Sequence, residues 1–267
     1  MRNRSVSVNP SQSKVSCLMV TANRRNLARR AVKSFLNQSY PNKELIVVDD
    51  GKQDYSPLFY DIPPNNLRYI KLDSNNKTVL GKLRNIAVEA ASGDYLTQWD
   101  DDDWYHPDRL LYQVEYLQKG YDACCLSASL MHLDDQEFFN MPYIGHLPEG
   151  IPGTIMHRRS DDIRYPALKL GEDTYYLKEW LRFRYTRLPS SYAGLFIRCF
   201  HGSNTWERQH FLRRLRNSPK SSFYFLYHKY VGRNLSGHPS FNLTKEQKKA
   251  FDLYLKESQE LSLFKNY

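Results

Sequence analysis

The middle of the sequence contains the stretch YLTQWDDDDWY at residues 95–105. Its apolar beginning, residues 95–99, predicts a short buried strand, and the four aspartates at 100–103 follow it directly. Four adjacent carboxylates repel one another, so they need a cation or contact with solvent. Carboxylates fixed at a strand end suit a hard divalent cation, which can also hold a diphosphate. The stretch therefore predicts a Mg²⁺ or Mn²⁺ site instead of an ordinary acidic surface loop.

Strands and helices alternate on both sides of this stretch. Apolar runs predict strands at 15–20, 45–48, 67–72, 123–127 and 195–200, and helical spacing of apolar residues predicts helices at 27–38, 80–91, 107–117, 172–183 and 244–261. Such alternation favours an α/β fold with a Rossmann-like, mostly parallel sheet flanked by helices. Because ligands bind outside the carboxyl ends of parallel strands, Asp49-Asp50-Gly51 is expected to face the same crevice as the aspartates.

The chain divides into three expected parts. Residues 1–14 are polar and predict a flexible lead, residues 15–205 predict one α/β domain, and residues 206–267 predict a basic helical extension. Residues 128–160 contain a segment rich in Pro and Gly, and we expect loops here, including Met156-His157-Arg158, to contact a second substrate.

Charge and composition limit the classes of partner. The chain has a net charge of +9, and residues 206–267 alone hold 12 Lys or Arg against 5 Asp or Glu. This excess indicates an anionic membrane surface, a phosphate-bearing ligand or a solvated helical face. No helix-turn-helix, zinc-finger or RNP-type motif is present, so nucleic acid is not an expected partner.

The expected location is cytoplasmic, with peripheral contact at the inner face of a membrane through the basic extension. No signal peptide and no run of roughly 20 apolar residues is visible. The four cysteines lack the spacing of a metal site, which fits buried thiols in a reducing compartment.

Several motifs, in this order, resemble the family-2 glycosyltransferases of the GT-A fold. They are Val47-Val48-Asp49-Asp50-Gly51, Gly81-Lys82-Leu83-Arg84-Asn85, Gly93-Asp94-Tyr95-Leu96, the aspartates with Trp104-Tyr105-His106-Pro107-Asp108-Arg109-Leu110, Gly171-Glu172-Asp173 and the segment HGSNTW at 201–206. The resemblance covers about residues 15–206 and predicts the same GT-A fold here. Any one of these motifs alone would be a weak signal, since Asp and Gly favour turns and acidic residues favour the first turn of a helix.

The resemblance also implies roles for individual residues. The nucleotide-sugar would be bound by Val20, Ala22, Asp50, Lys82, Arg84, Asp100 and Asp101, and the metal by Asp100, Asp102 and His201. Many relatives carry Tyr at the position of Ala22, which puts stacking on the base in doubt there. Asp173 would be the general base, or Glu172 if the register shifts by one. The alternatives without a functional role are that Arg84 is a charged residue on the surface of a helix and that His201 is a buried imidazole whose hydrogen bonds are made within the protein.

The implied activity is that of an inverting, divalent-metal-dependent glycosyltransferase. It would move a sugar from a nucleotide-diphosphate sugar, with a UDP-sugar as the expected donor, to a hydroxyl of a glycan or lipid-linked acceptor in polysaccharide or glycoconjugate synthesis. Two alternatives stay open at this point. A sugar-phosphate nucleotidyltransferase would need a basic phosphate-binding loop near the N-terminus, for which Arg24-Arg25 is a faint candidate, and a non-catalytic nucleotide-sugar binding module would show no turnover.

Overall fold

The computed structural model describes residues 13–73, 78–202, 204, 207–232 and 234–264. Most of the predicted lead at 1–14 therefore lies outside the described residues. Within the described part of the chain, no helix is long and apolar enough to cross a membrane.

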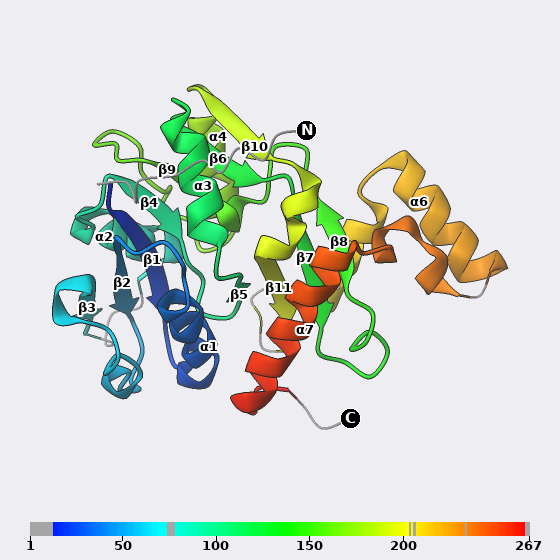
Figure 1. Cartoon of the computed structure of the whole chain (residues 1–267), viewed down its shortest axis with the longest axis horizontal. Coiled ribbons are helices and arrows are strands. Elements are labelled where there is room, and N and C mark those ends of the chain that lie inside the picture. Colours follow the sequence, from blue (N-terminus) through cyan, green and yellow to red (C-terminus); the bar gives the residue numbers. More distant parts are fainter. Residues whose placement is uncertain (1–12, 74–77, 203, 205–206, 233, 265–267) are drawn as a thin grey trace, which may run out of the picture.

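A seven-stranded sheet forms the centre of the molecule (Figure 1). Its strands, in spatial order, are β10 (Tyr185–Leu188), β6 (Ala123–Leu126), β9 (Met156–Arg158), β4 (Tyr95–Gln98), β1 (Val15–Thr21), β2 (Lys43–Asp49) and β3 (Leu67–Lys71). All neighbours are parallel except at β9, which runs antiparallel to β4 and β6. The prediction of a mostly parallel α/β sheet is confirmed.

Helices cover both faces of this sheet. Apolar side chains of α1 (Arg25–Leu36) and α3 (Arg109–Gln118) pack on one face, and those of α2 (Leu80–Ala90) and α4 (Glu172–Trp180) pack on the other. The central strands β1 and β2 are buried on both sides, which explains why they appear as continuous apolar runs in the sequence. The carboxyl ends of β1, β2 and β4 meet at one edge, where the aspartate cluster follows β4.

A second sheet of four strands lies beside the first (Figure 1). Its order is β5 (Trp104–Tyr105), β11 (Phe196–Phe200), β7 (Ala128–Leu133) and β8 (Tyr143–His146). The expectation that residues 128–160 are loops is therefore wrong for three segments, namely β7, β8 and β9. In β9, Met156 and His157 are 0% and 2% exposed because this short strand fills the gap between β4 and β6, so they do not contact a second substrate.

The basic C-terminal residues fold as α5 (Arg208–Leu212), α6 (Pro219–Leu226) and α7 (Lys245–Glu260). Helix α7 packs against the second sheet, where its Tyr254 joins Trp104 of β5 in one apolar cluster. The indole nitrogen of Trp104 also donates a hydrogen bond of 2.6 Å to Glu257 of α7. Helix α7 is thus tied to the segment that carries the aspartates.

Candidate functional site

A pocket of about 100 Å³ lies at the carboxyl ends of β1 and β4. The residues around it are mostly charged and come from segments distant in the sequence: Val20, Arg24, Leu80, Arg84, Asp100, Asp101, Asp102, Asp103, Leu170, Gly171, Glu172, Asp173, Arg198 and Asn204. The four aspartates thus share one pocket with both candidate bases, Glu172 and Asp173, whereas Asp49 and Asp50 at the end of β2 do not line it.

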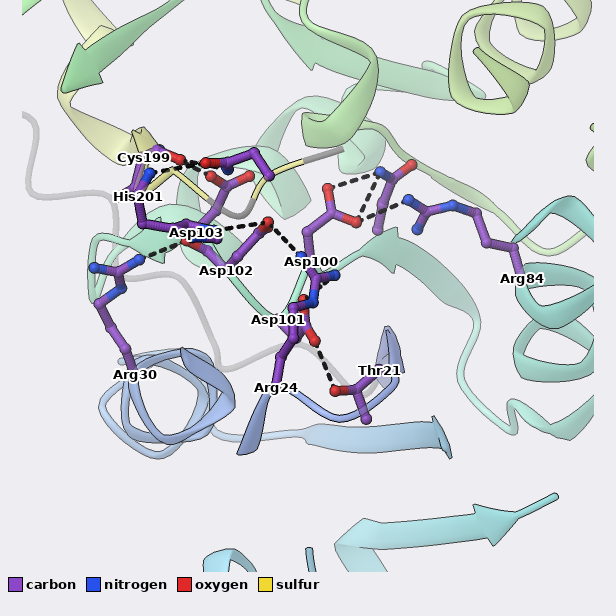
Figure 2. A network of polar contacts seen from close by, with 12 residues as sticks. Thr21, Arg24, Arg30, Arg84, Asp100, Asp101, Asp102, Asp103, Cys199 and His201 are labelled. Carbon is purple, nitrogen blue, oxygen red and sulfur yellow. Dashed lines mark hydrogen bonds and ion pairs between the residues drawn. The ribbon is translucent and has the colours of Figure 1, made fainter. Parts of the chain in front are cut away.

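The four aspartates point to different partners (Figure 2). Asp100 accepts hydrogen bonds from Arg84 at 2.9 Å and from the Gln98 amide at 2.9 and 3.1 Å. Asp103 is 4% exposed and accepts a hydrogen bond from the backbone amide of Cys199 at 3.1 Å. The two outer carboxylates of the cluster, Asp100 and Asp103, therefore bind to separate donors.

Arg24 holds the two central aspartates together. Its guanidinium lies 2.8 Å from Asp101 and 2.9 Å from Asp102. Asp101 is 1% exposed and also accepts a hydrogen bond of 2.6 Å from the Thr21 hydroxyl. The Asp102 carboxylate lies 3.4 Å from the imidazole of His201, which thereby joins the cluster.

These environments separate the pKa values of the two central carboxyls. Burial raises the pKa of Asp101 to about 7, even though Arg24 favours its charged form. Burial also opposes ionisation of Asp102, but the hydrogen bond with His201 and the charge of Arg24 outweigh it and hold its pKa well below its usual range. Of the two, Asp102 is the carboxylate that stays ionised at neutral pH.

Arg84 links α2 to both acidic segments of the pocket. Its Nε donates to Glu172 and its Nη2 donates to Asp100, each at 2.9 Å. Glu172 is 3% exposed, and burial raises its pKa against the effect of the Arg84 charge. Its carboxylate is committed to Arg84, so its position suits a role in fixing that arginine.

Asp173 lies at the junction of two pockets. It lines the pocket of the aspartate cluster and also a second pocket of about 90 Å³. This second pocket is bordered by Ser129, Met131, Arg198, His210 and Arg214, among others. The side chain accepts a hydrogen bond from the amide of Thr174 at 2.6 Å and forms none of the ion pairs among the described residues. Of the two acidic residues in the first turn of α4, Asp173 is the one open to both pockets.

The loops after β1 and β2 meet beside the pocket. The Asn23 side chain accepts a hydrogen bond from the amide of Lys52 at 2.8 Å, and a Cβ at Gly51 would lie only 2.5 Å from the Asn23 nitrogen. Next to this contact, Oδ1 of Asp50 is buried without a hydrogen-bond partner among the described residues. An unmatched buried acceptor of this kind suits an N–H group of a ligand.

The remaining predicted binding residues differ in their placement. Val20 lines the pocket at the end of β1. Ala22 is exposed on the loop that follows, and Lys82 is exposed on α2, and neither lines the pocket. Of the late histidine motif, His201 reaches Asp102, while residues 203, 205 and 206 lie outside the described residues.

Sequence reasoning missed two arginines of the site. Arg24 was considered only as part of a phosphate loop, yet its guanidinium is paired with Asp101 and Asp102. Arg198 of β11 lines both pockets and was not predicted at all. The signal that could have found Arg24 is its place just after β1, at the sheet edge that also carries the aspartates.

The donor set fits a divalent cation bound together with a ligand's oxygens. In the described part of the chain, no three His, Cys, Asp or Glu side chains converge on one point. However, Mg²⁺ is usually held by one or two carboxylates plus substrate phosphates. Asp102, ionised and 17% exposed at its side chain, and the nearby His201 provide such an incomplete set.

A family model matches this chain. The model described as Glycosyl transferase family 2 matches residues 16–166, which is more than half of the chain and contains β1 to β9. The chain is also 40% identical over 99 residues to WcaA of Escherichia coli, whose name refers to colanic acid biosynthesis and glycosyl transfer. That match covers 36% of this chain and 35% of WcaA, so the chain spans about a third of that relative.

Solved structures share the fold. The S. aureus protein TarS, residues 1–349 in complex with UDP, superposes with a TM-score of 0.56 and 20% identity over 89% of this chain and 78% of that one. The mannosyltransferase PcManGT from Pyrobaculum calidifontis, in complex with GDP-Man and Mn²⁺, superposes with a TM-score of 0.55 and 14% sequence identity. The match covers 94% of this chain and 82% of PcManGT. The fold is GT-A, as the resemblance predicted.

Proposed function

Because the chain belongs to glycosyl transferase family 2, we propose that it is an inverting, divalent-metal-dependent glycosyltransferase. It transfers a sugar from a nucleotide-diphosphate sugar to an acceptor hydroxyl in the synthesis of a polysaccharide or glycoconjugate. The observation that carries the proposal is the position of Asp173, which borders both the aspartate pocket and the adjoining pocket. The donor occupies the first pocket and the acceptor the second.

The nucleotide binds along the loops after β1 and β2. Asp50 offers its unmatched Oδ1 to an N–H group of the base, and Val20 borders the path to the aspartates. TarS binds UDP and PcManGT binds GDP-Man, so both kinds of nucleotide occur with this fold. A single buried acceptor matches the one imide N–H of uracil, which thymine shares, so it is compatible with the UDP-sugar that we propose as the donor.

Asp102 and His201 would hold the metal ion, with Asp100 at the edge of the site. When bound there, Mn²⁺ or Mg²⁺ would act as a Lewis acid that stabilises the negative charge of the leaving diphosphate. Asp100 is bonded to Arg84 and Gln98, so its main role is to keep Arg84 directed at the pocket.

Asp173 accepts the proton of the acceptor hydroxyl as that oxygen attacks the anomeric carbon of the sugar. The bond from this carbon to the diphosphate oxygen breaks, and its electron pair leaves with the nucleoside diphosphate. A single in-line displacement inverts the anomeric centre. Positive charge develops on the sugar ring in the transition state, as it does in glycoside hydrolysis. Glu172 fixes Arg84 and is not the base, because its carboxylate is buried in that ion pair.

The acceptor pocket favours an acceptor that carries a negative charge. Arg198 and Arg214 both border it, and no carboxylate lies within ion-pair distance of either arginine among the described residues. Burial, together with the charges of Arg198 and Arg213, lowers the pKa of Arg214 to about 10. Asp100, Asp103 and Asp173 line the same pocket, but neither arginine is tied to them by an ion pair, so an anionic group can bind between Arg198 and Arg214.

A donor screen tests the proposed activity. The purified chain is incubated with UDP-, GDP- and dTDP-sugars, with Mn²⁺ or with excess chelator, and release of nucleoside diphosphate is measured. Metal-dependent release from one donor is expected. Release of pyrophosphate from a nucleoside triphosphate and a sugar phosphate would instead indicate the nucleotidyltransferase, and binding without any turnover would indicate the non-catalytic module.

A further inference from the structure

Helix α6 continues without interruption into a π-helical turn at Tyr227–Val231, and this segment lies at the end of the molecule beyond β8 (Figure 1). It carries five exposed apolar or aromatic side chains: Phe223, Leu226, Tyr227, Tyr230 and Val231, which are 66%, 52%, 47%, 66% and 69% exposed. We call these five residues the apolar stripe. Their positions follow the i, i+3, i+4, i+7, i+8 pattern of one helical face.

The opposite side of the segment is already packed. Phe225 is 6% exposed and belongs to the apolar cluster that contains Phe211 and Leu215. The segment is therefore anchored to the domain by one face while the apolar stripe faces outward. Exposed apolar side chains gathered on one face mark a surface that binds a partner.

The charged residues next to the apolar stripe in the sequence have a single sign, although Arg208 is paired with Asp135 and Glu137. Between residues 208 and 245 the sequence contains no Asp or Glu and eight basic residues: Arg208, Arg213, Arg214, Arg216, Lys220, Lys229, Arg233 and Lys245. Lys220 and Lys229 lie on the same helical segment as the apolar stripe. Aromatic and aliphatic side chains flanked by Lys and Arg are typical of helices that lie in the interface of an anionic bilayer.

Two other occupants fit this surface less well. A second copy of the chain would bring two basic segments together around a twofold axis, and their charges would repel. The chain's own residues 1–12 contain two arginines and no acidic residue, so they offer no complementary charge.

We propose that the segment 219–231 is a membrane-docking element that inserts the apolar stripe into the interface of an anionic lipid bilayer, with Lys220 and Lys229 at the headgroups. This inference names the residues by which the basic extension would contact a membrane. His210 and Arg214 of the acceptor pocket lie in the short helical turns that come before α6 in the chain.

Vesicle sedimentation of the full chain tests the proposal. The wild type is expected to bind phosphatidylcholine vesicles that contain phosphatidylglycerol, to bind pure phosphatidylcholine far less, and to be released by salt. Phe223→Ser with Val231→Ser should lower the partition coefficient more than about tenfold, because two apolar side chains no longer insert. Lys220→Gln should lower it about fivefold for acidic vesicles only.

The matched control is Tyr60→Ser, because Tyr60 is 84% exposed but lies far from this segment in the chain. This variant should bind vesicles like the wild type. All variants should keep the wild-type melting temperature and the wild-type rate of donor turnover without vesicles, so that the docking proposal and the proposed activity are judged separately. Equal binding to neutral and acidic vesicles, no binding to either, or a dimer in solution that the Phe223→Ser change dissociates would overturn the proposal.

Discussion

The Nε atom of Arg84 donates a hydrogen bond of 2.9 Å to Oε1 of Glu172, and both side chains are almost fully buried. This contact joins α2 to α4, so it fixes the helix that carries Asp173 relative to the aspartate cluster. A buried ion pair contributes little net stability compared with a well-packed apolar pair, but loss of one partner leaves the other charge buried and uncompensated.

Arg84→Met should therefore lower the free energy of unfolding by about 3–5 kcal/mol, measured by urea denaturation. Glu172→Leu should lower it less, because Arg84 keeps its ion pair with Asp100. In the double variant Arg84→Met/Glu172→Leu the two losses should not add, because no buried charge of the pair remains. Strict additivity of the two single changes would show that Arg84 and Glu172 are not coupled.

Asp102→Ala should abolish metal-dependent nucleotide binding, because it removes the ionised carboxylate beside His201. Crowding of four carboxylates alone predicts that this change stabilises the metal-free protein. However, Asp102 is also paired with Arg24 at 2.9 Å, so the two effects should nearly cancel and leave the free energy of unfolding within about 1 kcal/mol of wild type. Titration calorimetry with a nucleotide, with and without Mn²⁺, measures the first effect. Asp161→Ala, an exposed aspartate, is the control, and full activity of the wild type in excess chelator would contradict the assignment.

Asp101 should make the stability of the metal-free protein depend on pH. Its pKa is raised to about 7 by burial, whereas an unfolded aspartate titrates near about 3.9. The folded state thus holds a proton that the unfolded state has lost, so stability from this group is present below about pH 4 and is lost as the pH rises through about 7. In Asp101→Asn this decline should disappear. Melting temperatures of both proteins across this pH range, in chelator, provide the measurement, and an unchanged decline in the variant would argue against the assignment.

Features of the fold that depend on neighbouring residues could be predicted from the sequence, and features that depend on contacts between distant residues could not. The strands β1, β2 and β4 could be predicted because each is a continuous apolar run, which is what burial on both faces demands. Strand β9 could not, because Met156-His157-Arg158 is too short to show a period and becomes a strand only between β4 and β6. The aspartates were visible as a cluster, but the pairing of Arg24 with Asp102 spans 78 residues, and lone arginines are common on surfaces.

Asp173→Asn should slow sugar transfer by about 10²–10⁴-fold, the usual contribution of a general base. The change keeps the size of the side chain and its acceptor for the Thr174 amide, so donor and metal affinity should stay at the wild-type level. Glu172→Gln is the comparison. Its loss of transfer rate should be smaller, because Glu172 acts by holding Arg84. Near wild-type transfer by Asp173→Asn, with donor affinity measured alongside, would remove the main support for the inverting mechanism.

Arg214→Gln tests the class of acceptor. Arg214 borders the acceptor pocket, and burial with the nearby Arg198 and Arg213 lowers its pKa to about 10, so an anionic group in the pocket should bind to it strongly. With matched acceptors that differ only in a carboxylate, such as a glucuronide and the corresponding glucoside, the wild type should prefer the glucuronide. Arg214→Gln should raise KM for the glucuronide by about 10–100-fold, the loss of one charge-assisted hydrogen bond, and should leave kcat and the donor KM unchanged.

Arg216→Gln is the control for that experiment, because Arg216 lies on the same short helical turn, is exposed and does not line the acceptor pocket. It should leave KM for both acceptors at the wild-type level. If Arg214→Gln instead weakens the two acceptors equally, the arginine shapes the pocket and does not recognise charge. If it weakens the donor, then the positive charge of Arg198 and Arg214 serves the diphosphate, and the boundary between donor and acceptor pockets lies beyond Asp173.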